Sequence, residues 1–466
     1  MDTKDGIHNG FKELGTGKMM VLGLQHVFAM FGATVLVPII TGLDVSVTLF
    51  CAGIATIWFF LITKRKVPIF LGSSFAFLAA FAAIAPKLVD AATGEATLPN
   101  MENLPYATLG VVCAGVLYVI LAVLIAIFGA KRVMKLFPPV VTGPIIILIG
   151  LILAPSAINN AQSNWILAVI AIAIIVCVNL FAKGMVKILP ILIGIFGAYA
   201  VGLVVGLIDP NALGMSWVNL SAMKGAQIVA VPPFTEYSPL RFVLGQQTFD
   251  PAVGWPAIVT FCAVALAAMV EHIGDICAIG ATTGKNYIED PGLTRTLLGD
   301  GIGTSLAGLF GGPANTTYSE NTGVVALTKV YDPWVMLIAA IFAIVLSFFN
   351  IFDAFINTIP AAVIGGISIV LYGMISATGV RTVVENQVDF KNMRNVIVAA
   401  LILVCGLGFN AYPITIGKVQ FGGLAMAAIV GILVNAILPG KDYEFGKVAN
   451  AKDGVWHKQD DESQKQ

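Results

Sequence analysis

Residues 313–323 read Pro313-Ala314-Asn315-Thr316-Thr317-Tyr318-Ser319-Glu320-Asn321-Thr322-Gly323, a polar, hydroxyl-rich stretch with one carboxylate, set between long apolar runs. A chain buried in a membrane places so many hydrogen-bonding groups at depth only where they line a cavity or serve a site. The stretch therefore predicts an interrupted membrane span at a functional site, and the rest of the chain is expected to be its scaffold.

The composition is that of a membrane protein. Hydrophobic residues make up 58% of the 466 residues and charged residues 11%, against about 25% charged in soluble domains. Many apolar runs approach the roughly 20 residues that a helix needs to cross a bilayer. We predict an all-α polytopic protein embedded in the lipid bilayer. The net charge of zero does not indicate nucleic-acid binding. The six scattered cysteines, which lack CxxC spacing, indicate neither disulfides nor a metal site.

Fourteen membrane spans are predicted from the apolar runs. The third and tenth open with Gly, Pro, Ser or Thr segments and hold too few apolar residues for one straight helix, so we expect them to be broken. The predicted spans are residues 18–41, 45–63, 68–86, 105–129, 136–155, 165–182, 188–207, 255–279, 293–311, 318–331, 333–351, 359–380, 394–409 and 419–438.

The distribution of Lys and Arg predicts the orientation of these spans. If the N-terminus is cytoplasmic, nearly all basic residues fall in the tails and the inside loops. The exceptions are Lys87, Lys224, Arg241 and Lys418. We therefore expect both termini in the cytoplasm and an even number of spans, which fourteen satisfies and twelve satisfies almost as well.

Three short words recur in the same order in the two halves of the chain. Residues 25–27 resemble 271–273, residues 73–77 resemble 316–320, and residues 137–147 resemble 359–369. The second comparison pairs Phe75 with Tyr318. Because each half holds seven spans, the second copy must be inverted in the membrane. Inverted repeats with paired broken helices are typical of secondary transporters, whose substrate lies near the midplane at the breaks.

Four acidic residues lie within or at the edge of the predicted spans: Glu271, Asp275, Asp300 and Glu320. A lone carboxylate in the bilayer costs about 2.5–3.5 kcal/mol on insertion scales, so each must be paired, protonated, near the interface or functional. Glu271 and Asp275 share one helix face, which suits proton uptake and release. Asp275 could equally hydrogen-bond a neighbouring helix, and Asp300 could be a helix cap in water. His26 is either a proton carrier or a helix–helix contact.

The two breaks supply donors and aromatic faces. Ser73-Ser74 and Thr316-Thr317 are expected to leave backbone N–H groups free, with the positive end of the following half-helix pointing at the break. Phe75 and Tyr318 could sandwich a flat ring between them. Carboxylates, free N–H groups and aromatic faces together describe a site for a small planar heterocycle with amide groups, such as a nucleobase. An amino acid or an inorganic anion remains an alternative.

Residues 320–329 resemble the signature of the nucleobase–ascorbate transporter family, (Q/E)-N-x-G-x(4)-T-(K/R/G). Residues 25–38 and 71–77 are similar to its bacterial uracil-transporting members almost word for word. The resemblance implies a 7+7 inverted repeat, short antiparallel strands at the breaks of spans 3 and 10, and a homodimer. It also implies a core domain (residues 18–129 and 255–351), a gate domain (130–207 and 352–438), a loop (208–254) and cytoplasmic tails (1–17 and 439–466).

The resemblance also implies proton symport of a nucleobase across the bacterial inner membrane, with no cofactor and no enzymatic reaction. Glu271 and Glu320 match the carboxylates that hold ring N–H groups, and Phe75 and Ser319 match positions whose backbone contacts the ring. Glu320 in place of Gln favours uracil over purines. Asp275 departs from the uracil-transporting members, which carry His there, and together with Asp300 it keeps a xanthine or purine symporter open. An anion exchanger of the same plan is a more distant alternative.

Overall fold

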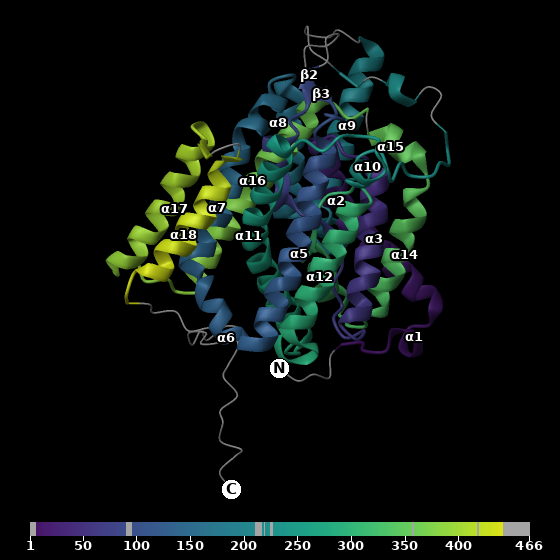
Figure 1. Cartoon of the computed structure of the whole chain (residues 1–466). Helices are drawn as coiled ribbons and strands as arrows, with labels where there is room; N and C mark the ends of the chain where they lie inside the picture. The colour runs from purple at the N-terminus through teal and green to yellow at the C-terminus, as the bar shows by residue number, and fades with distance from the viewer. Residues whose placement is uncertain are drawn as a thin grey trace.

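The computed structural model describes residues 6–89, 96–209, 217–218, 220–223, 227–356, 358–416 and 419–440. Lys224, Lys418 and most of the predicted C-terminal tail lie outside these residues. The chain forms a bundle of helices that run side by side over most of their length (Figure 1). Helical elements occur at each of the fourteen predicted spans, with ends that differ by a few residues.

Eight helices in the described part of the chain are long and apolar enough to cross a membrane. A ninth span results if α14 (Trp334–Ser347) and α15 (Asn350–Ile356), which meet at 79°, count as one. The eight are α2 (Thr16–Thr41), α3 (Val45–Ile62), α5 (Leu104–Phe128), α7 (Pro139–Ala161), α9 (Pro190–Ile208), α11 (Pro251–Thr283), α16 (Ala361–Glu385) and α17 (Met393–Ala411).

The remaining predicted spans are shorter or more polar helices. Three of them are apolar: α8 (Trp165–Phe181), α18 (Gly423–Ile437) and the helical segment Phe75–Ile84. The third predicted span is a short helix, η2 (Phe75–Phe77), continued by α4 (Leu78–Ile84). The ninth and tenth are α12 (Leu293–Leu309) and α13 (Ser319–Thr328). Short helices α1 (Gly10–Glu13), α6 (Ala130–Val133) and α10 (Leu240–Val243) lie outside the predicted spans.

Glycines set how closely the central helices approach one another. A Cβ on Gly115 of α5 would lie 2.4 Å from the Gly301 carbonyl oxygen of α12, and one on Gly301 would lie 2.8 Å from the Gly115 carbonyl oxygen. The same holds between α7 and α16, where a Cβ on Gly150 would meet the carbonyl oxygen of Tyr372. Small residues that let helix backbones touch are the usual basis of tight association in membranes.

The helices pack in two groups. Helices α2, α3, α5, α12 and α14 contact one another, and α7, α8, α9, α16, α17 and α18 do the same. In Figure 1, α7, α16, α17 and α18 lie on one side of the bundle and α3, α12 and α14 on the other. Helix α11 touches members of both groups, including α5, α7 and α18. The site must therefore be sought along α11.

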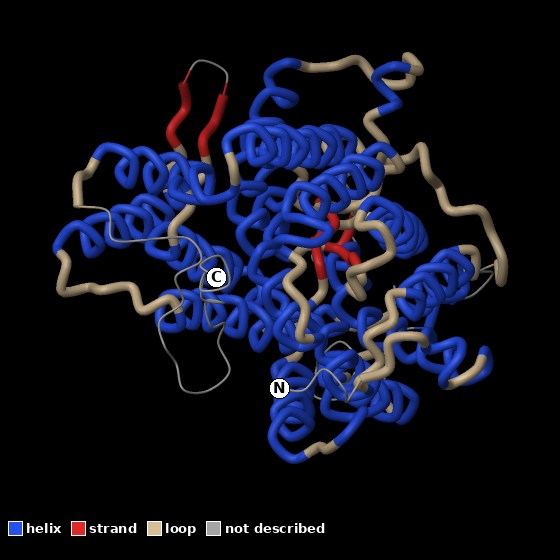
Figure 2. Tube along the Cα trace, turned by 90° about the horizontal axis from the view of Figure 1, so that it is seen from below, coloured by secondary structure: helices blue, strands red, loops and turns tan. Residues whose placement is uncertain are grey.

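The two broken spans meet as a pair of antiparallel strands. Strand β1 (Leu71–Ser73) pairs with β4 (Asn315–Thr317), with Gly72 opposite Thr316 at the centre. All six residues are buried. In the view from below, strand segments are visible in the middle of the bundle (Figure 2). The expected short strands at the breaks are thus present. The other strand pairs are β2 (Leu88–Val89) with β3 (Ala96–Leu98) and β5 (Ile414–Ile416) with β6 (Val419–Phe421).

The register of this strand pair corrects the predicted equivalence of Phe75 and Tyr318. Ser74 N donates to the Ala314 carbonyl at 2.8 Å, and Tyr318 N donates to the Phe70 carbonyl at 3.0 Å. These two bonds are symmetric about the central Gly72–Thr316 pair, so Ser74 corresponds to Tyr318. Phe75, where η2 begins, therefore corresponds to Ser319, where α13 begins. The sequence comparison was wrong by one residue, and in a strand one residue exchanges the two faces.

We expect Gly72→Ala to destabilise the protein. Its Cβ would lie 2.5 Å from the Tyr318 ring and 2.8 Å from Thr34 Oγ1, and overpacking of this kind costs about 1–3 kcal/mol. Thermal unfolding of the purified protein in detergent should show a lower Tm. Gly373→Ala in α16 is the matched control, because its Cβ would meet no atom within 4 Å. Equal Tm values for the two variants would contradict the close packing at the strand centre.

Candidate functional site

One face of α11 opens onto unfilled space. Glu271 and Gly274 are exposed, whereas His272, Ile273 and Asp275 between and beside them are buried. A Cβ on Gly274 would meet no atom within 4 Å. Helix α11 contacts both groups of helices, and Glu271 lies on its exposed face.

The first turn of α13 presents a matching surface. Ser319 is exposed, Glu320 is half-buried, and Gly323 is exposed with no atom within 4 Å of where its Cβ would lie. Glu271 and Glu320 lie near enough for their charges to interact. Each carboxylate is followed one helical turn later by a glycine, so each helix leaves room beside its acid.

Asp275 fixes the broken span to α11. Thr317 Oγ1 donates a hydrogen bond to Asp275 Oδ2 at 2.7 Å, and Ser319 Oγ donates one to Asp275 Oδ1 at 2.6 Å. Both carboxylate oxygens are thus engaged by the break between β4 and α13. Of the two predicted readings of Asp275, the contact with a neighbouring segment is present in the structure. These bonds hold Ser319, and with it the neighbouring Glu320, beside α11, where Glu271 lies one helical turn before Asp275.

His26 connects α2 to the same turn of α13. The Asn321 side-chain Nδ2 lies 3.1 Å from His26 Nδ1 and donates to the His26 carbonyl at 3.1 Å. Since an amide nitrogen only donates, Nδ1 of the fully buried imidazole is the acceptor and the ring proton resides on Nε2. His26 therefore makes the helix–helix contact that was one of its two predicted roles.

Asp300 is not a helix cap in water. It lies within α12 with no exposed surface, and its Oδ2 is 2.8 Å from Nδ1 of His272, which is also fully buried. A carboxylate at this depth needs such a partner, because an unpaired charge in the low-dielectric interior is strongly disfavoured. The pair joins α12 to α11 directly behind the face that carries Glu271.

Tyr318 does not line the open space as expected. Its side chain is 3% exposed, and its hydroxyl donates to the Ser73 carbonyl at 2.8 Å and accepts from Thr34 Oγ1 at 3.3 Å. The ring packs on Gly72, within the strand pair. The predicted sandwich of a flat ring between Phe75 and Tyr318 is therefore wrong in this structure. Phe75 remains partly exposed.

One of the backbone amides that were predicted to be free, that of Ser74, is paired. The amides of Ser74 and Tyr318 are paired across the two strands. In contrast, neither η2 nor α13 has a side-chain cap at its amino end, and the first amides of a helix have no partner within it. The first-turn amides beginning at Phe75 and Ser319 are therefore candidate donors for a ligand.

Sequence reasoning did not predict the side-chain contacts of two polar residues, Asn321 and Thr317. Asn321 lies inside the recognised signature, yet its bonds to His26 depend on how α2 and α13 meet. Thr317 was expected to contribute a backbone donor, whereas its hydroxyl holds Asp275. Both residues lie in the polar stretch 313–323, but nothing in the sequence indicated which side chains they would contact.

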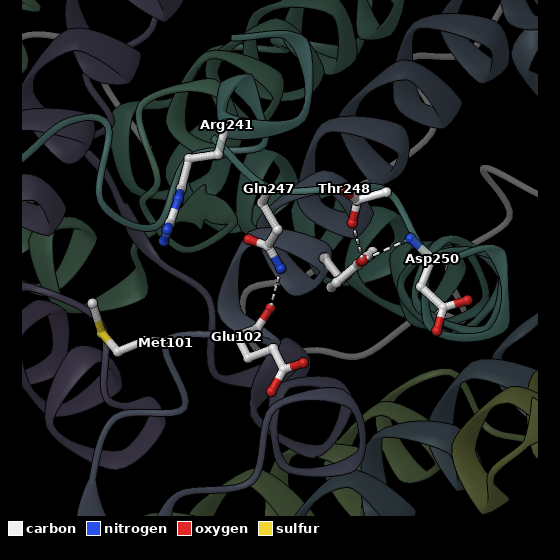
Figure 3. A pocket seen from close by; sticks show the side chains of 7 residues that line it. Met101, Glu102, Arg241, Gln247, Thr248 and Asp250 are labelled. Carbon is white, nitrogen blue, oxygen red and sulfur yellow. Dashed lines mark hydrogen bonds between the residues drawn. The ribbon is translucent and has the colours of Figure 1, made fainter. Parts of the chain in front are cut away.

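The described residues contain no group of three or more His, Cys, Asp or Glu that could hold a metal ion. A surface hollow of about 490 Å³ lies between the start of α5 and the segment before α11, with Arg241 and Gln247 in its wall (Figure 3). A second hollow of about 670 Å³ lies beside residues 65–66 and 285–290. Neither is lined by a predicted site residue.

Comparison with known proteins places these features in a family. Residues 17–415 match the profile of a permease family, that of the xanthine/uracil permeases. The chain belongs to this family. It is 39% identical to the uracil permease of Bacillus caldolyticus over 438 residues, which covers 91% of this chain and 93% of that one. It is 35% identical to the uracil permease of Escherichia coli strain K12, covering 89% and 90%.

Solved structures show that this permease shares its fold with anion transporters. The transmembrane domain of a cyanobacterial bicarbonate transporter, BicA, aligns over 92% of this chain and 99% of that one, with a TM-score of 0.60 and 15% identity. The murine anion transporter Slc26a9, in its inward-facing state, aligns over 94% and 69%, with a TM-score of 0.63 and 10% identity. At these identities the likeness concerns the fold alone.

Asp275 and Ser319 should be energetically coupled. We expect Asp275→Asn and Ser319→Ala each to lower the free energy of unfolding in detergent, and the double variant to lose less than the sum. The coupling should be about 0.5–3 kcal/mol, as for directly bonded pairs. Glu289→Gln, at an exposed acid in the short helical segment η7 (Ile288–Gly292), combined with Ser319→Ala gives the additive control. Additive losses for Asp275 and Ser319 would contradict the bond.

Proposed function

We propose that the chain imports uracil together with a proton, by alternating access, across the bacterial inner membrane. The observation that carries this proposal is the pair of carboxylates, Glu271 and Glu320, which are near enough for their charges to interact, with Glu320 in the first turn of the broken span. The names of the relatives, uracil permeases from several bacteria, support the choice of substrate.

Uracil offers two ring N–H donors and two carbonyl oxygens, and the site offers their complements. Glu271 accepts one ring N–H and Glu320 accepts the other. The first-turn amides beginning at Phe75 and Ser319 donate to a carbonyl oxygen, helped by the positive ends of their helices. The Phe75 ring covers one face of the pyrimidine. A charged acceptor makes the stronger class of hydrogen bond, so Glu320 contributes the stronger of the two bonds, while Glu271, once protonated, accepts through its carbonyl oxygen.

Proton coupling follows from the electrostatics of two acids in a membrane. A site that moves through low dielectric with unpaired negative charge is disfavoured by several kcal/mol. A proton taken up with the substrate removes one of these charges. We assign this proton to Glu271, the more exposed acid. Asp275, His26 and Asp300 are engaged by Thr317 and Ser319, Asn321 and His272 respectively, and they remain secondary candidates.

We further propose that the two groups of helices are the moving parts. The core domain comprises residues 18–129 and 255–351, and the gate domain residues 130–207 and 352–438, which gives fourteen spans with both termini in the cytoplasm. The packing of α7, α8, α9, α16, α17 and α18 with one another supports a separate gate. The gate domain is also proposed to form the homodimer, and exposed apolar residues on its α17 and α18, such as Val404 and Ile437, support this.

Two other substrates are the alternatives to uracil. Asp275 favours a xanthine or purine symporter, because the uracil-transporting members of the family carry His at that position. The fold shared with a bicarbonate transporter favours an anion, but the two carboxylates on the open space would repel one. Uracil satisfies both acids as a neutral donor.

Uptake of radiolabelled uracil into proteoliposomes tests the proposal directly. We expect accumulation that requires an inward proton gradient and collapses when a protonophore is added. Unlabelled uracil should compete strongly and xanthine weakly. Failure of uracil to accumulate, or accumulation that ignores the gradient, would refute uracil–proton symport. Strong competition by xanthine and weak competition by uracil would support the purine alternative.

Glu271→Gln should separate binding from coupling. The amide keeps an acceptor oxygen but cannot take up a proton, so uracil should still bind, with a Kd within about tenfold of the unmodified protein, equivalent to about 1.4 kcal/mol. Gradient-driven accumulation should be lost, while exchange of uracil at high concentration persists. Glu289→Gln is the control. A Glu271→Gln protein that still concentrates uracil would remove Glu271 from the coupling role.

A further inference from the structure

The N-terminal residues 6–13, here called the N-terminal strap, lie on the connector 329–334 that follows α13. Ile7 N donates to the Lys329 carbonyl at 2.9 Å, and Tyr331 N donates to the Ile7 carbonyl at 2.8 Å. These bonds form a parallel bridge in which Ile7 lies opposite Val330. The strap thus adds backbone pairing at the point where α13 ends.

A buried carboxylate anchors the other end of the strap. Asp332 is 4% exposed. Its Oδ2 accepts from Gly10 N at 2.8 Å, and its Oδ1 accepts from Trp334 N at 3.1 Å. Gly10 begins α1 and Trp334 begins α14. One side chain therefore joins the strap to the start of α14, and both helix amino ends favour its negative charge.

Aromatic and apolar contacts complete the attachment. Gly6 packs against the Tyr331 ring, where a side chain would not fit. The rings of Phe11 and Trp334 meet edge to face with centroids 6.2 Å apart. Gly10 packs against Met19 of α2. The strap is therefore seated on three elements: the connector, α14 and α2.

The position of the strap matters because α13 is short. Its ten residues carry Glu320, and its amino end is fixed by β4, Asp275 and the Asn321–His26 contact. Its carboxyl end turns at Lys329, which adopts the left-handed conformation with φ 56°. A ten-residue helix is marginal by itself. Within the described residues, the carbonyl of this turning residue is bonded by the strap amide of Ile7.

We propose that the N-terminal strap is a positioning element for the substrate site, and that Ile7 and Asp332 are its positioning residues. They fix the carboxyl end of α13, so that Glu320 at its amino end keeps its place opposite Glu271. The effect on the helix stands without the proposed function. Only the expected effect on uracil affinity rests on that function.

Hydrogen–deuterium exchange of the full-length protein in detergent tests the effect on the helix. Ile7→Pro removes the backbone N–H that donates to the Lys329 carbonyl, whereas Ile7→Val keeps this N–H. We expect peptides from the carboxyl half of α13 to exchange about tenfold faster or more in Ile7→Pro, as for the loss of about 1.4 kcal/mol of local stability. Peptides from α12 should be unchanged, as should α13 in Ile7→Val and Lys12→Ala. Unchanged α13 exchange in Ile7→Pro would overturn the proposal.

A covalent link tests whether the strap stays in place, and it does not depend on the folding of the proline variant. Residues paired across a β-bridge meet the Cα spacing of a disulfide, so Ile7→Cys with Val330→Cys should crosslink on oxidation. We expect the crosslinked protein to show slower exchange at the end of α13 and to retain uptake. Uptake that is lost on oxidation and restored by reductant would overturn a fixed positioning role.

The Kd for uracil distinguishes a positioning role from a merely structural one, because a strap with only a structural role would leave this Kd unchanged. We expect Ile7→Pro to raise the Kd for uracil about three- to tenfold, equivalent to about 0.7–1.4 kcal/mol, with unchanged affinity in Ile7→Val. Faster α13 exchange with an unchanged Kd would refute the link to the site. Absence of uracil binding by the unmodified protein would refute the proposed substrate and leave the exchange result as the test of the strap.

Discussion

The structure depends on one constraint, that backbone groups inside a membrane must find partners within the protein. A helix that is interrupted within the membrane leaves amides and carbonyls without helical partners where no water is available to bond them. Here the two breaks satisfy each other, since residues 70–74 of one half pair with residues 314–318 of the other. The site is a by-product of this arrangement. The strands use the amides inside the breaks and leave those that begin η2 and α13 for a ligand.

Around this pair, the buried polar residues act mainly as ties. Asp275 holds the start of α13 to α11, His26 and Asn321 hold it to α2, and His272 and Asp300 hold α11 to α12. Each tie removes a polar group from the list of free acids and bases. Glu271 stays exposed and Glu320 half-buried, and these are the two acids that we propose to meet substrate and proton.

The helical elements and the two breaks could be predicted, because they follow from hydropathy and from local composition. The orientation of Tyr318 could not. The repeat comparison aligned Phe75 with Tyr318 because both are aromatic, but hydrogen-bond register, not likeness of side chains, decides which residue faces the open space. Asp300 shows the same limit: its neighbour glycines suggested a helix end, whereas its partner His272 lies 28 residues earlier on another helix.

The strand pair also has a consequence for synthesis, because its two strands are made far apart in time. Ser73 and Tyr318 are 245 residues apart in the chain, and at about 5–20 residues per second the second strand emerges roughly 10–50 s after the first. Throughout that interval Thr56 can bond the backbone of Leu71, but the groups of the first break that pair with β4 have no partner strand. The insertion machinery, or water held near the half-finished site, has to shelter these groups. Biogenesis of this permease is therefore a problem of holding one half until the other arrives.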